Sequence, residues 1–222
     1  MFTVSFIGSK GGCAKTTSAI GLSVAAARAG RDVALIDLDP QATAANWKDR
    51  RSEESPAVIS AQASRLRQTL DAARDAGADL AVIDTAGRND DSALNAARAS
   101  DLVLIPSKAV IGELETLGKV QDLLRVAGNP PSFVLLNRIE PGATRQFEEA
   151  RTMVERVFGL RVCPFYLSQL RAYENALETG QSAQEIDPNG KTAGELQRLY
   201  LFVCELVNIG NGEHGQKLTS RA

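Results

Sequence analysis

The sequence predicts an α/β protein, with a mostly parallel, twisted sheet and helices on both of its faces. Short apolar runs alternate with helical patterns along nearly the whole chain. Runs such as 33–37 are apolar up to a final acid, as expected of parallel strands that are covered on both faces. The first strand, a glycine-containing loop, a helix and the run 33–37 form a βαβ unit, which implies a right-handed crossover.

The predicted strands are the apolar runs, and the predicted helices have apolar residues at helical spacing. Gly30 is expected to end the first helix, because glycine readily adopts the left-handed conformation beyond a helix C-terminus. Pro106 and Pro164 are each expected to stop a strand, since proline lacks the N–H that a sheet ladder needs. We expect strands at 4–7, 33–37, around 58–59, 79–84, 102–106, 133–138 and, at the sheet edge, 160–164; helices at 16–29, 41–51, 63–76, 90–100, 112–126, 144–158 and 192–207; and an irregular loop at 180–190.

Length and composition indicate one ordinary globular domain. The 222 residues are predicted to form a single domain over 1–209, followed by a flexible tail over 210–222. The net charge of −2 gives no overall basic field that would draw the chain to nucleic acid or to a membrane, so a basic patch must be local. We expect no signal peptide and no membrane-spanning segment.

The loop over residues 8–17, Gly-Ser-Lys-Gly-Gly-Cys-Ala-Lys-Thr-Thr, has the residues of a phosphate cradle. Gly11 and Gly12 allow backbone N–H groups to approach an anion closely. Lys15 can reach the outer phosphates, and the Thr16 hydroxyl can bind Mg²⁺ at the positive end of the helix dipole. The stretch therefore predicts a nucleotide site between the first strand and the first helix.

The strict pattern G-x-x-x-x-G-K-[ST] is not met, because its two framing glycines fall on Ser9 and Ala14. A second lysine, Lys10, precedes Lys15. The pattern Lys-Gly-Gly-x-x-Lys-Thr-Thr resembles the deviant P-loop of the ParA/MinD group of ATPases. The resemblance implies a P-loop NTPase fold and a lysine, Lys10, that reaches across a dimer to the partner's nucleotide. Nearly every family member has glycine where Ala14 stands.

Two further motifs follow strands at the edge where ligands bind in open α/β sheets. The segment 37–41, Asp-Leu-Asp-Pro-Gln, matches the second motif of the family, in which Asp39 orients the attacking water and Asp37 supports the metal shell. Asp84 ends an apolar strand, as does the Mg²⁺-associated carboxylate of P-loop NTPases. Gly87 is a candidate hinge that senses the γ-phosphate.

The implied reaction is ATP hydrolysis with Mg²⁺, slow until a partner stimulates it. The predicted strand 133–138 ends in Asn137 and Arg138, and in relatives the residues at the end of this strand contact adenine. The Asn137 side chain offers the paired donor and acceptor that an adenine edge needs. We assign catalytic roles to Lys10, Lys15 and Asp39; nucleotide binding to Gly11, Gly12, Cys13, Ala14, Lys15, Thr16, Thr17, Asn137 and Arg138; and metal binding to Thr16, Asp39 and Asp84.

The resemblance is strongest to the small partition ATPases of the ParA type that lack a helix-turn-helix. It implies a homodimer when ATP is bound, non-specific DNA binding and a ParB-like centromere-binding adaptor, in a cytoplasmic and nucleoid-associated protein. The DNA-binding positions are then Arg145 and Arg171, and their phosphate contacts would be salt-sensitive.

Other classes stay open. A MinD-like ATPase that binds a membrane would need a basic amphipathic C-terminal helix, whereas 208–222 contains three glycines and no apolar face. A conjugation-associated ATPase that positions a protein cargo is a close alternative. A small-molecule enzyme such as dethiobiotin synthetase or a nitrogenase-type iron protein is a second, although Cys163 and Cys204 lack the context of cluster ligands. A non-hydrolysing scaffold is a third.

The cysteines are odd in number and widely spaced, which favours reduced thiols. Cys13 differs from the others because it lies within the phosphate loop. Beside Lys10, Lys15 and a helix N-terminus, the pKa of its thiol is expected to be lowered.

Overall fold

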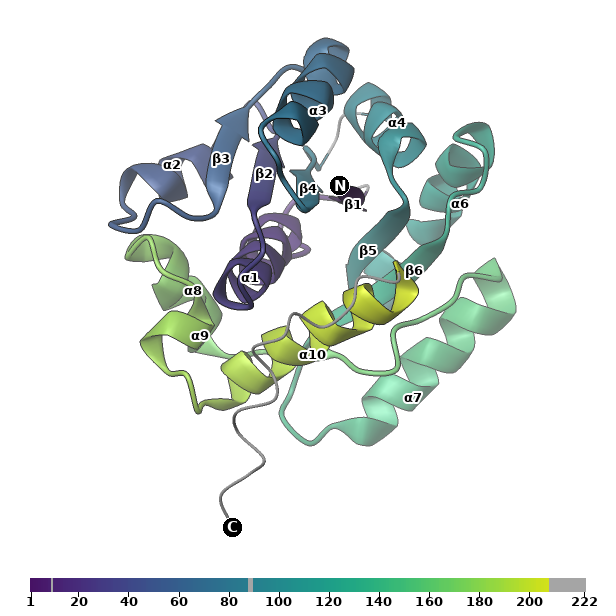
Figure 1. The fold of residues 1–222 in the computed structure, drawn as a ribbon. Coiled ribbons are helices and arrows are strands. Elements are labelled where there is room, and N and C mark those ends of the chain that lie inside the picture. The colour runs from purple at the N-terminus through teal and green to yellow at the C-terminus, as the bar shows by residue number, and fades with distance from the viewer. Residues whose placement is uncertain (9, 88–89, 208–222) are drawn as a thin grey trace.

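The computed structural model describes residues 1–8, 10–87 and 90–207. The predicted tail over 210–222 lies outside these described residues. Within the described residues, seven strands form one sheet in the order β3-β2-β4-β1-β5-β6-β7, and every neighbouring pair is parallel (Figure 1). The strands are β1 (Phe2–Phe6), β2 (Val33–Asp37), β3 (Ala57–Ser60), β4 (Leu80–Asp84), β5 (Leu102–Lys108), β6 (Ser132–Ile139) and β7 (Leu167–Ser168). The predicted α/β class is confirmed.

The helices cover the sheet from both sides. They are α1 (Lys15–Arg28), α2 (Thr43–Asp49), α3 (Leu66–Asp75), α4 (Asp90–Ala99), α5 (Ile111–Leu114), α6 (Leu117–Val126), α7 (Thr144–Met153), α8 (Arg171–Glu178), α9 (Ala183–Ile186) and α10 (Lys191–Leu206), with a 3₁₀ turn at Ala63–Arg65 and a π-helical turn at Val154–Phe158. Among the described residues, no helix has the length and apolarity needed to cross a membrane.

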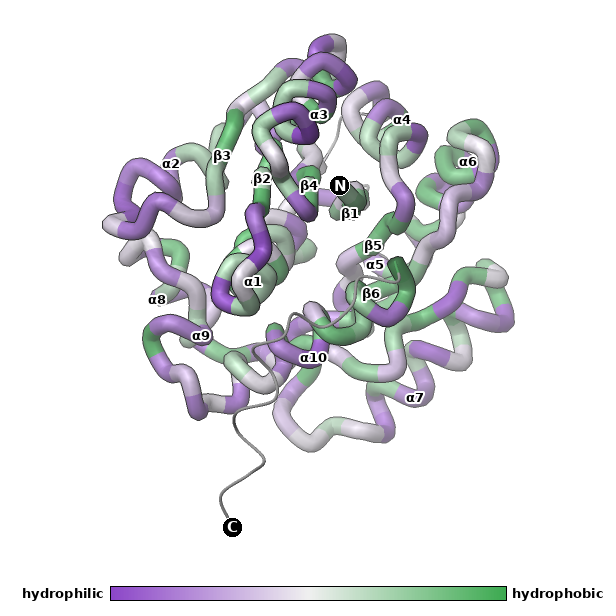
Figure 2. The backbone as a smooth tube through the Cα atoms, viewed as in Figure 1, coloured by the Kyte–Doolittle hydropathy of each residue, from purple (hydrophilic) through white to green (hydrophobic). Residues whose placement is uncertain are grey.

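Two hydrophobic cores form because alternate residues of each strand point to opposite faces. Val4 and Phe6 of β1 pack in the core with α1 and α10, whereas Ala81 and Ile83 of β4 pack with α3, α4, α6 and α7. Strands β2, β3 and β5 are accordingly drawn largely in the green of hydrophobic residues in Figure 2. Helix α1 lies very close to α10, since a Cβ on Gly21 would collide with the Leu196 side chain.

Strand β5 continues to Lys108, so the prediction that Pro106 stops it is wrong. The N–H of Val103 donates to the β6 side of the sheet (Pro131 O, 2.8 Å), and Leu104 O accepts from the β1 side (Ile7 N, 3.0 Å). By alternation, the missing N–H of Pro106 falls on the β1 side, beyond the end of β1 at Phe6. The proline therefore removes no ladder hydrogen bond.

Three other expected elements differ from the structure. The edge strand is Leu167–Ser168, whereas 160–164 contributes one isolated parallel bridge, from Val162 to Val134. The helix expected over 112–126 is interrupted between α5 and α6, where Thr116 donates both its hydroxyl and its N–H to Glu113 O. The loop over 180–190 contains α9, which begins with a capping box of a serine and a glutamate; this Ser-x-x-Glu signal stood in the sequence.

Candidate nucleotide site

The candidate site lies at the carboxyl edge of the central strands, where the loop between β1 and α1 meets the ends of β2 and β4. The sheet register places Phe6 beside Asp84, and Asp84 beside Asp37. The same loop is packed against the segment after β4, because a Cβ on Gly87 would lie 2.7 Å from Gly11 N. Close approach of two backbones therefore explains Gly87, while its hinge role stays a prediction.

The two lysines of the loop lie in different environments. Lys15 is 6% exposed, and its Nζ donates to the backbone oxygen of Lys10 at 3.0 Å. Lys10 Nζ instead donates to Gly112 O, at the start of α5, at 2.6 Å. The ammonium of Lys15 thus stays within the loop, as phosphate binding requires, whereas that of Lys10 rests on another segment of the chain.

Thr16 and Asp84 are in direct contact, as expected of a Mg²⁺ site. The Thr16 hydroxyl donates to Asp84 Oδ2 at 2.6 Å. Asp84 is fully buried, and this burial raises the pKa of its carboxyl to about 7 even though the Thr16 hydrogen bond lowers it. Its Oδ1 is buried without a hydrogen-bond partner among the described residues. A carboxylate held in this way fits a bound cation that would stabilise its charge, so Thr16 and Asp84 are the residues that would hold Mg²⁺.

The Asp37 carboxylate accepts hydrogen bonds from backbone N–H groups of the segment that follows β2. Its Oδ1 accepts from Asp39 N at 3.0 Å, and its Oδ2 accepts from the N–H groups of Ala44 and Ala45 at the start of α2. Burial raises the pKa of the Asp37 carboxyl, and these N–H groups oppose the rise. Both oxygens are therefore engaged in anchoring the segment that carries Asp39, while the expected support of the metal shell by Asp37 stays a prediction.

Asp39 is half-buried and lies two residues beyond the sheet. Its Oδ1 accepts from Gln41 N at 2.9 Å, and its backbone oxygen accepts from Ala42 N at 2.8 Å. The turn after β2 therefore has a fixed shape, set by Asp37 on one side and Asp39 on the other. The catalytic and metal roles of Asp39 stay predictions.

The prediction of a lowered thiol pKa at Cys13 is wrong. Cys13 is buried, and this burial raises the pKa more than the nearby ammonium of Lys15 lowers it. The distance from Lys15 Nζ to the sulfur is 3.6 Å, and the thiol donates to Lys10 O at 3.2 Å. The sequence showed the nearby charges but could not show that the side chain points into the protein.

Ala14 adopts the left-handed backbone conformation that favours glycine, with φ of 66° and ψ of 28°. Gly12, two residues earlier, has φ of 74°. The Ala14 carbonyl accepts the first helical hydrogen bond, from Ser18 N at 3.0 Å. The loop therefore keeps the left-handed turn that glycine normally supplies at this position, with a Cβ present.

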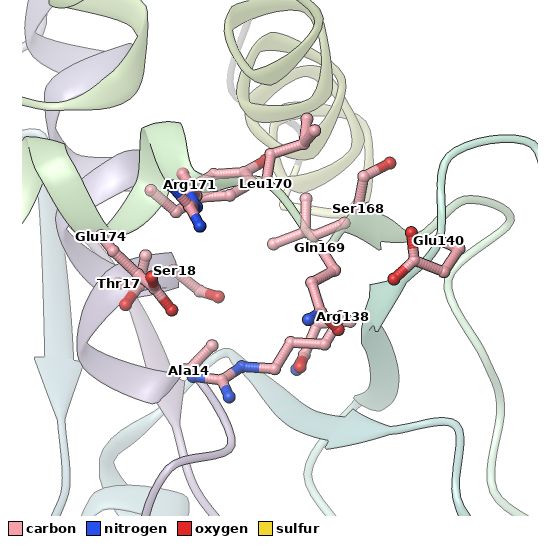
Figure 3. A pocket seen from close by; sticks show the side chains of 13 residues that line it. Ala14, Thr17, Ser18, Arg138, Glu140, Ser168, Gln169, Leu170, Arg171 and Glu174 are labelled. Carbon is pink, nitrogen blue, oxygen red and sulfur yellow. The ribbon is translucent and has the colours of Figure 1, made fainter.

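A pocket of about 330 Å³ extends from the phosphate loop to the far edge of the sheet (Figure 3). Asn137 Nδ2 donates to Cys13 O at 2.9 Å, while its buried Oδ1 has no partner among the described residues. The free oxygen is an acceptor, which suits the amino group of adenine. Arg138 and Arg171 reach toward the pocket from opposite sides. The lining residues are Ala14, Thr17, Ser18, Asn137, Arg138, Glu140, Leu167, Ser168, Gln169, Leu170, Arg171, Tyr173 and Glu174.

The structure therefore gathers most of the residues predicted for nucleotide and metal binding, including Thr17. It separates the two predicted DNA-binding residues, since Arg171 lines the pocket and Arg145 is exposed on α7 with an ion pair to Glu149 (2.7 Å). The sequence did not assign the outer wall of the pocket, residues 167–174, to the nucleotide site, because this segment carries no nucleotide-binding motif; it assigned Arg171 to DNA instead.

Comparison with known proteins supports this geometry. The model of the CobQ/CobB/MinD/ParA nucleotide binding domain matches residues 4–183. The chain belongs to this family. Maintenance of carboxysome distribution protein A from Gloeobacter kilaueensis is 31% identical over 206 residues, covering 91% of this chain and 92% of its own. Protein virC1 from Rhizobium rhizogenes is 35% identical over 191 residues, covering 81% and 82%.

The solved structure of MinD with Mg-ADP from Pyrococcus horikoshii OT3 superposes with a TM-score of 0.75 at 19% identity, covering 94% of this chain and 98% of its own. This likeness confirms the fold. The expected ParA/MinD type is also confirmed, as a nucleotide-binding domain of this family. The bound Mg-ADP is a property of the MinD structure, and ATP hydrolysis with Mg²⁺ stays the expected activity of this chain.

Proposed function

We propose that this ATPase segregates DNA by a cycle in which ATP binding joins two copies and hydrolysis separates them. The supporting observation is the position of Lys10, whose ammonium lies on Gly112 O and outside the cradle that Lys15 occupies. The neighbouring Val110 and Ile111 are exposed apolar residues, with Ile111 66% exposed. A second copy that faces this surface would cover them and bring the two Lys10 side chains toward the opposite nucleotides.

Within this proposal each residue has one task. Lys15 and the N–H groups of the loop hold the phosphates, and Thr16 with Asp84 holds Mg²⁺, which neutralises phosphate charge when it is bound. Asp39 orients the attacking water from the turn that Asp37 fixes. Lys10 of a second copy neutralises charge in the transition state. None of these residues is a strong general base, so we expect slow turnover until a ParB-like adaptor accelerates it.

We propose that the ATP-bound dimer binds DNA without sequence specificity and is therefore associated with the nucleoid. Arg145 is exposed at the start of α7, where it can contact a phosphate once Glu149 releases it. Arg171 lies at the pocket, so its proposed contact with DNA would also depend on the nucleotide. A dimer presents two copies of each arginine to one DNA duplex, so the local basic surface doubles although the net charge stays acidic. The binding should weaken steeply with salt.

The second candidate cargo is a protein body instead of DNA. It is favoured by the name of one relative, the carboxysome distribution protein, which covers nine-tenths of this chain. Both candidates share the ATP-dependent dimer and differ in the adaptor and the cargo. Hydrolysis stimulated by a centromere-binding adaptor supports partition of DNA, whereas stimulation by a coat protein of the cargo alone favours the second candidate.

The test combines sedimentation with random DNA and size-exclusion chromatography, each with ATP and with ADP. We expect the native protein to form dimers and to sediment with DNA in ATP alone. Lys15→Ala should lose nucleotide binding, and Asp39→Ala should form ATP-bound dimers that do not hydrolyse. Full turnover by Asp39→Ala would contradict the assigned mechanism.

Charge reversal separates the DNA surface from general electrostatics. Arg145→Glu and Arg171→Glu should each reduce ATP-dependent sedimentation with DNA, whereas Arg67→Glu on the exposed face of α3 should not. If all three variants bind DNA like the native protein, the proposed surface is wrong.

A further inference from the structure

A buried carboxylate joins the last helix to the outer wall of the pocket. Glu195 of α10 is 4% exposed. Its Oε2 accepts from the N–H of Ser168 at 2.9 Å and from the hydroxyl of Tyr173 at 2.8 Å, and its Oε1 accepts from the hydroxyl of Ser168 at 2.5 Å. Burying a carboxylate is costly unless hydrogen bonds satisfy its oxygens, and here both residues that supply them line the pocket.

Few hydrogen bonds of the sheet hold this outer wall in place. Strand β7 has two residues and, within the described part of the chain, pairs with β6 alone at the edge of the sheet. One further backbone hydrogen bond follows, from Gln169 N to Ile139 O at 2.8 Å. Between Ser168 and Tyr173 the chain turns from the strand into α8 and lines the pocket, with Ser168 and Gln169 opposite Thr17 and Ser18 of α1 (Figure 3).

We propose that Glu195 is a positioning residue for nucleotide binding. Through Ser168 and Tyr173 it fixes the outer wall, residues 167–174, at the distance from α1 that a bound nucleoside requires. It touches neither the phosphate loop nor the Mg²⁺ residues in the contacts described, so its effect falls on the affinity for ATP and leaves the chemical step unchanged. The inference rests on the pocket being the nucleoside site, as the proposed function has it, and is independent of DNA and cargo.

Two substitutions at this position separate geometry from charge. Glu195→Gln can keep all three contacts, because its amide oxygen accepts from Ser168 N and the Tyr173 hydroxyl, while its NH₂ group donates to the Ser168 oxygen. Glu195→Ala removes all three and leaves the buried N–H of Ser168 without a partner. Tyr173→Phe removes one of the three and keeps the ring.

The test measures ATP affinity by calorimetry with Mg²⁺, and KM and kcat by steady-state hydrolysis. We expect Glu195→Ala to raise Kd and KM on the order of ten-fold and Tyr173→Phe on the order of three-fold, with kcat at saturating ATP within about two-fold of native. Glu195→Gln should restore near-native values. Val203→Ala is the matched control, because it opens a cavity on the same helix, about two turns beyond Glu195, and lowers thermal stability while leaving all three Glu195 hydrogen bonds in place.

A native KM in both Glu195→Ala and Tyr173→Phe would overturn the proposal. So would a KM in Glu195→Gln as high as in Glu195→Ala, or an equal rise in Val203→Ala. If Glu195→Ala does not fold, Tyr173→Phe and Glu195→Gln decide the question alone. Absence of ATP binding by the native protein would instead refute the proposed function, so the two failures are distinguishable.

Discussion

Replacing Ala14 with glycine should stabilise the nucleotide-free protein. The φ of 66° places Ala14 in the left-handed region, which costs a residue with a Cβ roughly 1–2 kcal/mol. Glycine has no such cost but loses more chain entropy on folding, by roughly 0.5–1 kcal/mol. The difference between the mid-values of these two ranges is a net gain of about 0.75 kcal/mol. For a domain of this size it corresponds to a rise in Tm of roughly 1–4 °C.

The assay measures unfolding by urea and by heat in the absence of nucleotide, with circular dichroism as the signal. Ala72→Gly is the control, since Ala72 is an exposed residue within α3 and glycine there should cost about 1 kcal/mol. The same chemical change should thus have opposite signs at the two positions. An Ala14→Gly protein no more stable than the native one would refute the claim that the loop stores strain at this residue.

Three further changes test the site and the core. Gly87→Ala places a Cβ against the backbone of the phosphate loop, so ATP affinity measured by calorimetry should fall on the order of ten-fold or more; unchanged affinity would contradict the close packing. The pKa of Asp84 is raised from 3.8 to about 7, so between these pH values the folded chain holds a proton that the unfolded chain has lost. The free energy of unfolding should therefore fall as the pH rises from 3.8 to about 7. Asp84→Asn should flatten this slope in urea titrations at several pH values; an unaltered slope would assign the dependence to other groups. Arg51→Met removes the buried cation that pairs with the half-buried Glu185 and should cost about 3 kcal/mol, whereas Arg74→Met, at an exposed ion pair, should cost less than about 1 kcal/mol in the same assay.

The fold was predictable where local sequence decides it. The runs 33–37 and 80–84 are buried along their whole length, so their apolar pattern located β2 and β4 to within a residue. Pro106 shows the limit, because whether its missing N–H matters depends on where β1 ends, and that is set by a distant segment. The edge strand was misplaced for a related reason, since two residues of pairing leave almost no pattern.

The site was predictable where chemistry and backbone coincide. The loop motif brought Lys15 and Thr16 to their expected places, and the end of an apolar strand brought Asp84 to Thr16. Cys13 shows what such reasoning misses, because its pKa depends on burial and not on neighbouring charges alone. No sequence motif marks Glu195 as part of the site either. Its partners are 22 and 27 residues away, and tertiary packing alone makes it part of the site.

The arrangement of the cradle links the two lysines. Lys15 Nζ is held by the backbone oxygen of Lys10, while Lys10 Nζ is held by Gly112 O, so residue 10 is bound at both its backbone and its side chain. Phosphates that attract Lys15 would remove the first of these bonds, and a second copy that attracts the Lys10 ammonium would remove the other. Since both bonds restrain the same residue, we expect the loss of one to weaken the restraint that supports the other. Occupation of the cradle and approach of a second copy should therefore favour each other, which is the coupling that an ATP-dependent dimer needs.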